Sequence, residues 1–146
     1  MRKEIIGDGA AGFCFGCGQS NPIGLRLKFY LEDNNQVVTE FTPTKWHSGW
    51  KNVTHGGIIC TILDETMGWT VVNVLKVMSV TKELKINFIR PIFIDKKITV
   101  KCRVINEDKK VIKLLSKVKN DNGDICATAE AIYVVLNQDK LKKINQ

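Results

Sequence analysis

The sequence lacks the features of secreted and membrane proteins. Its first residues, MRKEIIGDG, contain no hydrophobic segment of signal-peptide length, and no apolar run is expected to be long enough to span a membrane. The five cysteines are an odd number and follow no secretory signal, which favours reduced thiols in a reducing compartment. We therefore expect a cytoplasmic protein with no membrane partner.

Linkers, repeats and low-complexity segments are also missing. The chain has 146 residues and only three prolines, and its apolar content of 44% is enough to bury a core without disulfides or metals. We expect a single domain over residues 1–146, in which 1–13 form a flexible lead-in and 137–146 form a polar tail.

Ligands for a structural metal are scarce. Cys14 and Cys17 have the spacing of a zinc-binding pair, but no second closely spaced pair completes the four ligands that a structural zinc needs. The other thiols, Cys60, Cys102 and Cys126, occur singly in apolar patterns typical of a core. The ligand count favours no metal, and a site at Cys14 and Cys17 is the alternative that stays open.

Basic residues are unevenly placed. The net charge is +7, and the whole excess lies after Leu75, where 16 basic and 8 acidic residues fall, against 6 and 7 before it. A cationic surface can bind nucleic acid, an acidic membrane or a phosphorylated small molecule, although solvated strand faces and a lysine-rich tail explain it equally well. No helix-turn-helix, zinc-finger repeat or aromatic stacking motif is present, so we expect no nucleic-acid partner.

The stretch from Thr54 to Leu75 is the one segment long enough to form a substantial helix. It begins with a histidine and two glycines, after which apolar residues fall on almost every side. This pattern predicts a helix enclosed by other structure. Asp64 and Glu65 interrupt it, and a carboxylate in an enclosed helix is costly unless it is paired or used.

The helix period separates the two ends of this segment. His55 and Asp64 are nine residues apart, which is about 2.5 turns and roughly 13 Å. The remaining half turn puts them on opposite faces. If the glycine entrance and Asp64 act in one reaction, a second copy of the chain has to bring one of them, so the sequence predicts a dimer with shared sites.

The rest of the chain alternates between apolar and polar residues with a period of two. This period predicts strands, and Asn122-Gly123 is a strong hairpin signal. Short connections favour antiparallel pairing, so we expect an α+β fold with a mostly antiparallel six-stranded sheet curled around one long central helix. The expected strands cover residues 25–31, 36–42, 79–89, 98–104, 111–119 and 124–136.

The sequence resembles the hotdog-fold acyl-CoA thioesterases, in particular the group that includes the phenylacetic-acid-pathway thioesterases. Four blocks carry the resemblance and occur in the family's order: CFGCGQSNPIGLRL at 14–27, HGGIICTILDE at 55–65, TKELKINFIRPI at 81–92 and ATAEAIYVV at 127–135. The resemblance implies the hotdog fold and hydrolysis of a thioester bond.

The resemblance also implies roles for single residues. The backbone N–H of Gly56 would bind the thioester carbonyl, and Asp64 of the neighbouring subunit would act as general base or as nucleophile. Thr81 occupies the strand position that orients the attacking water. Some relatives have an asparagine six residues before the histidine, where this chain has Gly49, so His47 or Ser48 would take over that role or it would be absent.

The remaining candidates have supporting roles. His55 is expected to hold the glycine turn formed with Gly57 rather than to act as an acid or base. Glu65, about 100° further round the helix than Asp64, is the reserve carboxylate. His47 is expected to be structural.

Coenzyme A carries phosphates, so the basic second half of the chain has a natural ligand. Arg90, Lys96 and Lys97 are the candidate contacts, and coenzyme A would be part of the substrate, so no cofactor is expected. We expect a homodimer or a dimer of dimers. Two other functions stay open: a hotdog dehydratase of 3-hydroxyacyl thioesters that uses the histidine as base, and a non-catalytic acyl-CoA sensor. The acyl chain is not specified by the sequence.

Overall fold

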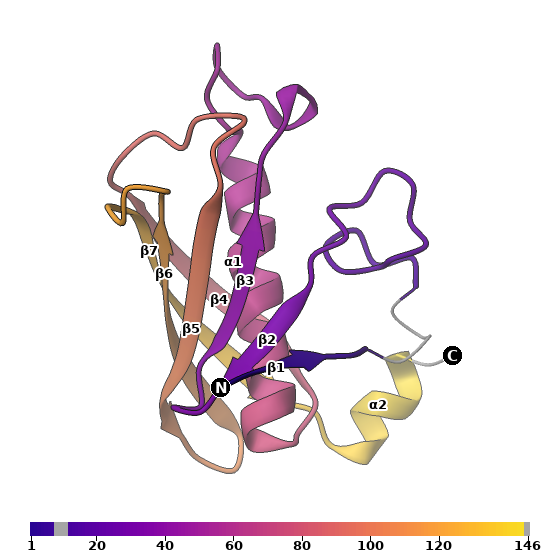
Figure 1. The fold of residues 1–146 in the computed structure, drawn as a ribbon. Helices are drawn as coiled ribbons and strands as arrows, with labels where there is room; N and C mark the ends of the chain where they lie inside the picture. Colours follow the sequence, from indigo (N-terminus) through magenta and orange to yellow (C-terminus); the bar gives the residue numbers. More distant parts are fainter. Residues whose placement is uncertain (8–11, 145–146) are drawn as a thin grey trace.

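The computed structural model describes residues 1–7 and 12–144 and has one antiparallel sheet wrapped around one long helix (Figure 1). The sheet has seven strands in the order β1-β2-β3-β5-β6-β7-β4. The elements are β1 (Arg2–Ile5), β2 (Phe29–Glu32), β3 (Val37–Phe41), η2 (Lys45–His47), α1 (Gly56–Thr70), η3 (Val71–Leu75), β4 (Ser79–Phe88), β5 (Ile98–Glu107), β6 (Val111–Lys119), β7 (Ile125–Val135) and α2 (Gln138–Ile144).

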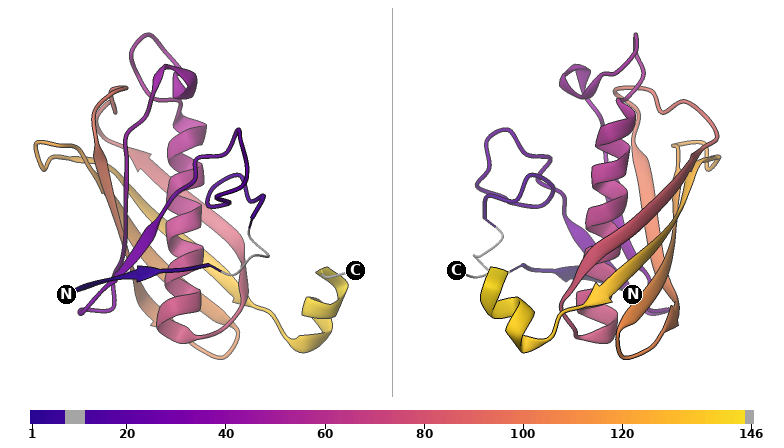
Figure 2. Two further views of the ribbon diagram at one scale, coloured as in Figure 1. Left: turned by 45° about the vertical axis from the view of Figure 1, so that its right-hand side comes forward. Right: turned by 180° about the vertical axis from the view of Figure 1, so that it is seen from behind.

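The central helix forms where the sequence predicts it. α1 runs directly into η3, a short π-helical turn that ends at Lys76 in the left-handed conformation. Two buried polar residues of α1 are satisfied inside the helix, because the hydroxyls of Thr66 and Thr70 donate to the carbonyls of Ile62 and Thr66 at 2.6 and 2.7 Å. The helix lies in the concave face of the sheet (Figure 2), which buries one side of it and leaves the other side partly exposed, whereas the apolar pattern predicted a helix enclosed all round.

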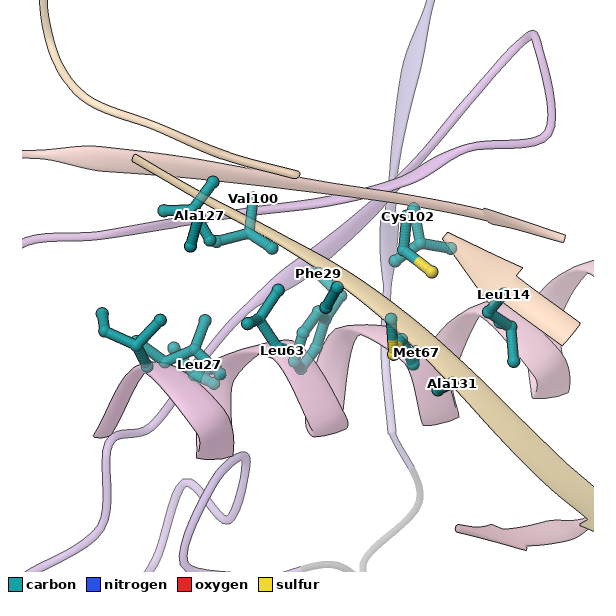
Figure 3. Packing of buried hydrophobic residues seen from close by; sticks show 14 of the residues in the cluster. Leu27, Phe29, Leu63, Met67, Val100, Cys102, Leu114, Ala127 and Ala131 are labelled. Carbon is teal, nitrogen blue, oxygen red and sulfur yellow. The ribbon is translucent and has the colours of Figure 1, made fainter. Parts of the chain in front are cut away.

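The core lies between α1 and the sheet. Leu63 and Met67 of α1 face Val100 and Cys102 of β5 (Figure 3), and these four side chains are buried. Alanines supply the inward positions of β7 up to Tyr133, and small side chains let the helix lie close to the sheet.

The helix from Gly56 to Leu75 has the length and composition of a membrane span, with 20 residues and a mean hydropathy of 1.3. The expectation that no such segment exists did not allow for a run interrupted by two carboxylates. The packing accounts for the composition, because Ile62, Leu63 and Met67 are fully buried against the sheet.

β4 is an edge strand that pairs only with β7 among the described strands. Its register with β7 shifts between Thr81 and Glu83, as in a β-bulge. Thr81 and Tyr133 are direct partners across this ladder, so their side chains lie on the same face.

The fold class is the expected one, and three details differ. The seventh strand is β1, which forms within residues 1–13 and pairs with β2. α2 forms within the polar tail and lies away from the sheet (Figure 1). The strand expected from residue 25 begins at Phe29 instead, because Arg26 has a positive φ of 52° that breaks the extended backbone. The other expected flexible positions, 8–11 and 145–146, lie outside the described residues.

Candidate active site

The first turn of α1 presents an unused hydrogen-bond donor. His55 is the N-cap, and its Nδ1 accepts the N–H of Gly57 at 2.8 Å. The His55 N–H donates to the carbonyl of His47 at 2.8 Å, which fixes the loop before the helix. The N–H of Gly56 makes no hydrogen bond within the described residues. A free N–H at a helix N-terminus is suited to bind an oxygen that carries negative charge.

A hollow of about 300 Å³ adjoins Gly56. Phe88 and Arg90 contribute to its wall, and the Arg90 guanidinium donates to the carbonyl of Ile125 at 2.6 Å. The hydroxyl oxygen of Thr54 is buried beside the hollow and has no hydrogen-bond partner in the described part of the chain. The hollow therefore combines a backbone donor, a cation and a buried hydroxyl.

Asp64 is held by two hydroxyls. Its Oδ1 accepts hydrogen bonds of 2.6 Å from both Thr81 and Tyr133, and the Tyr133 hydroxyl also lies 2.7 Å from the Asp64 carbonyl. Burial, together with the hydrogen bond to Asp64, raises the pKa of Tyr133 well above its ordinary value of 10.0, so this hydroxyl stays a donor. Among the described residues, Oδ2 of Asp64 accepts no hydrogen bond, which leaves this oxygen free to bind water or to attack.

Asp64 lies at the edge of a large groove with a volume of about 790 Å³. Apolar side chains from three parts of the chain line it, namely Ile5, Trp69, Val72, Met78 and Val80. A groove of this size with a fixed carboxylate at its edge has the character of a site for an apolar ligand.

Gly56 and Asp64 belong to different cavities of the same chain. They are eight residues apart on α1, which corresponds to about 12 Å. One chain therefore does not bring the free N–H and the free carboxylate oxygen together.

The expected phosphate contacts and the reserve carboxylate do not lie together in one site. Arg90 lies beside Gly56, whereas Lys97 pairs with Glu40 at 3.8 Å and Lys96 is exposed. Glu65 lines the same groove as Asp64 but accepts no hydrogen bond from Thr81 or Tyr133; its Oε1 lies 3.4 Å from the sulfur of Cys14.

The loop before the helix uses its polar groups locally. His47 Nδ1 accepts the N–H of Thr44, and the Ser48 hydroxyl donates to Lys45. Burial lowers the pKa of His47. A Cβ at Gly49 would lie 2.8 Å from Cα of His55, so the side chain found at this position in some relatives does not fit this loop as it stands.

Sequence reasoning missed Tyr133 and Thr54. A signal for Tyr133 was present, since a tyrosine at an inward position of an apolar strand needs a hydrogen-bond partner when it is buried. No signal pointed to Thr54, because its burial depends on how the loop packs against residues after β4.

The sequence matches the family described as the thioesterase superfamily over residues 51–127. A protein of Saccharolobus solfataricus, SSO1253, whose name is a provisional esterase assignment, is 33% identical over 119 residues, which cover 81% of this chain and 77% of that protein.

Solved structures agree on the fold. A thioesterase superfamily protein, RHA08564, superposes with a TM-score of 0.76 and 20% identity over 80% of this chain, which spans only 57% of that longer chain. A hypothetical thioesterase from Streptococcus pneumoniae, solved with coenzyme A, superposes with a TM-score of 0.67 and 21% identity, over 70% of this chain and 80% of that chain. The Escherichia coli PaaI protein of the phenylacetic acid degradation operon superposes with a TM-score of 0.71 and 18% identity, over 77% of this chain and 81% of that chain. The hotdog fold and the family expected from the four sequence blocks are thus confirmed, and the chain belongs to the thioesterase superfamily.

Proposed function

We propose that the protein is a cytoplasmic acyl-CoA thioesterase that works as a homodimer or a dimer of dimers. One subunit provides the Gly56 N–H as oxyanion donor, and a second copy provides Asp64. The observation that carries the proposal is the state of Asp64, whose Oδ1 is held by Thr81 and Tyr133 while Oδ2 is free at the edge of an apolar groove.

Hydrolysis of a thioester places negative charge on the carbonyl oxygen. The Gly56 N–H, at the positive end of α1, is oriented to stabilise this charge without reorganisation. Asp64 acts either as a general base that removes a proton from the attacking water, or as a nucleophile that forms a mixed anhydride which water then hydrolyses. In both cases a carboxylic acid and a free thiol are the products.

The hydroxyls of Thr81 and Tyr133 position the carboxylate. By holding Oδ1, they fix the carboxylate and leave Oδ2 without a hydrogen bond among the described residues, beside the groove that Asp64 lines. Thr81 therefore acts in this proposal through Asp64, and the attacking water is oriented by Oδ2.

Coenzyme A is the proposed thiol component of the substrate. Arg90 lines the same hollow as Gly56 and is the proposed phosphate contact, although the phosphates lie at the far end of the pantetheine arm from the thioester, so the arm would have to fold back along this hollow. Lys96 and Lys97 follow on the loop after Arg90 and extend the positive charge, although Lys97 would have to exchange its pairing with Glu40. The relative from Streptococcus pneumoniae that was solved with coenzyme A supports this ligand class.

The position of His55 favours hydrolysis over dehydration. A dehydratase would use the histidine as base, but Nδ1 of His55 already accepts the Gly57 N–H as the helix cap. In this role His55 shapes the turn that presents the Gly56 N–H.

Two variants remove one half of the site each. Asp64→Asn removes the carboxylate charge. Gly56→Pro removes the N–H alone: proline suits the first position of a helix, His55 has φ −58° and ψ 132° as a residue before proline requires, and a Cβ at Gly56 meets Phe88 at an ordinary 3.6 Å. Gly56→Ala, which keeps the N–H, is the matched control.

The test is to mix the two inactive variants after unfolding and refolding them together. In a mixed dimer, the Gly56 N–H of the Asp64→Asn chain meets Asp64 of the Gly56→Pro chain, so random pairing should restore about a quarter of the wild-type thiol release. If each variant is inactive and mixing restores nothing, the shared site is wrong. If Asp64→Asn hydrolyses acyl-CoA as fast as wild type, the catalytic role of Asp64 is wrong, and binding of acyl-CoA by wild-type protein without turnover identifies a sensor.

A further inference from the structure

Two cysteines and a glutamate outside the proposed site form a cluster. Cys14 and Cys17 lie in the loop before β2, and Glu65 projects from α1 toward them. One ligand atom from each residue lies within 4.8 Å of the other two, and the sulfur of Cys14 is 3.4 Å from Oε1 of Glu65. The pair that looked incomplete in the sequence thus has a third ligand group from a distant element.

The loop is built around this cluster. The N–H of Cys17 donates to the sulfur of Cys14 at 3.5 Å, and the N–H of Gly18 donates to the Cys14 carbonyl at 2.9 Å, which winds the chain so that both sulfurs point the same way. A Cβ at Gly16 would lie 2.2 Å from Cγ of Glu65. Of the two residues between the cysteines, the second therefore has to be glycine for the glutamate to reach them.

The atoms suit a small divalent cation with a preference for sulfur. Ligand atoms of a tetrahedral zinc lie ~3.5–3.8 Å apart, given Zn–S bonds of ~2.3 Å and Zn–O bonds of ~2.0 Å. The observed 3.4 Å between Cys14 and Glu65 is already near this value, and the 4.8 Å limit for the whole set requires only small side-chain rotations. Two thiolates and one carboxylate also compensate the charge of the ion.

We propose that the chain binds one Zn²⁺ through Cys14, Cys17 and Glu65, with water as the fourth ligand. The ion fastens the loop of residues 12–27 to α1 at the residue that follows Asp64. The proposal does not depend on the hydrolase function.

The experiment uses the untagged full-length protein, reduced and freed of metal, titrated with Co²⁺ and then with Zn²⁺. Thiolate ligation gives a sulfur-to-cobalt charge-transfer band that saturates at one ion per chain and disappears when Zn²⁺ displaces the cobalt. Zn²⁺ should also raise the Tm of the wild-type protein by several degrees, because an ion that binds only the folded state stabilises it.

Variants assign the ligands. Cys14→Ser and Cys17→Ser should lose the band, and Glu65→Gln should weaken Zn²⁺ binding at least tenfold, roughly the cost of losing even an indirect metal contact. Cys60→Ser is the matched control, since this cysteine lies on α1 outside the cluster, and it should bind like wild type. The proposal is overturned if reduced wild-type protein gives no stoichiometric band, if Cys14→Ser and Cys60→Ser bind alike, or if Glu65→Gln leaves the affinity unchanged.

Discussion

Asp64 and Glu65 are adjacent carboxylates on one helix that face opposite kinds of surroundings. Asp64 accepts hydrogen bonds from two hydroxyls on the sheet and keeps one oxygen free at an apolar groove. Glu65 lies against two thiols from an irregular loop. The helix rotation of about 100° between neighbours is enough to give them different partners.

The difference shows that the surroundings of an acid, and not its place in a motif, decide what it does. Hydroxyl donors fix the direction of a carboxylate and leave its second oxygen available to a substrate. Thiols next to a carboxylate are soft ligands and favour a metal. Each prediction below changes one side of this comparison.

The largest effect is expected from Asp64→Asn, which keeps the shape and the acceptor for Thr81 and Tyr133 but removes the charge. We expect kcat/KM for acyl-CoA hydrolysis to fall by about 10²–10⁴-fold. Glu65→Gln should lose less, because Glu65, although it lines the same groove, is not held by Thr81 and Tyr133 and lies against Cys14. Thiol release from short, medium, long and aryl CoA esters measures both, with Asp108→Asn in the β5–β6 turn as control. If Asp64→Asn and Glu65→Gln lower kcat/KM equally, the two carboxylates do not have different roles.

Tyr133→Phe tests the hydroxyl side alone. The variant loses the hydrogen bonds to Asp64. Its free energy of unfolding should be lower than that of the wild type by about 1.5–3 kcal/mol, the range for a hydrogen bond to a charged group. We also expect kcat to fall more than KM rises, since the carboxylate loses its orientation and the groove keeps its shape. Urea denaturation and steady-state kinetics give the two numbers. Tyr30→Phe, whose ring packs under Arg2, should change neither.

Gly16→Ala tests the thiol side. The added Cβ clashes with the Glu65 side chain, so we expect a loss of about 1–3 kcal/mol in the free energy of unfolding. Gly68→Ala is the matched substitution on α1, where the Cβ would lie 3.9 Å from the Tyr133 ring, and it should stabilise the helix by about 0.5–1 kcal/mol. Thermal unfolding of both variants measures these changes in stability. If Gly16→Ala is as stable as the wild type, Glu65 does not approach the loop closely.

The smallest effect concerns alkaline pH. The folded protein keeps the Tyr133 proton above the ordinary pKa of 10.0, whereas the unfolded chain loses it, so the unfolded state binds fewer protons and stability falls as pH rises above about 10. Denaturation between about pH 8 and 11 should show a smaller alkaline loss for Tyr133→Phe than for wild type. Identical slopes would place the Tyr133 hydroxyl in contact with water.

The sequence predicted the central helix nearly to its ends, because apolar residues recur through residues 54–75 on both sides of the two carboxylates and the segment begins at a histidine and two glycines. It also predicted that His55 and Asp64 lie on opposite faces, which follows from the helix period alone. β1 and α2 were missed because both are short and mostly exposed, so neither has a periodic apolar pattern.

The partners of the two acids could not be predicted in the same way. Thr81 was singled out through the resemblance, but Tyr133 meets Asp64 across 69 positions of sequence, and the register of β4 on β7 decides that contact. Glu65 reaches Cys14 across 51 positions because a glycine in the loop leaves room for it.

Local pattern by itself determined the helix, the alternating strands and the half turn that separates His55 from Asp64, because these depend on periods of 3.6 and 2 residues that can be read from the sequence. Only the tertiary structure decided which carboxylate meets hydroxyls and which meets thiols. Those contacts join distant segments, and they form when the sheet closes around the helix and sets each strand in register.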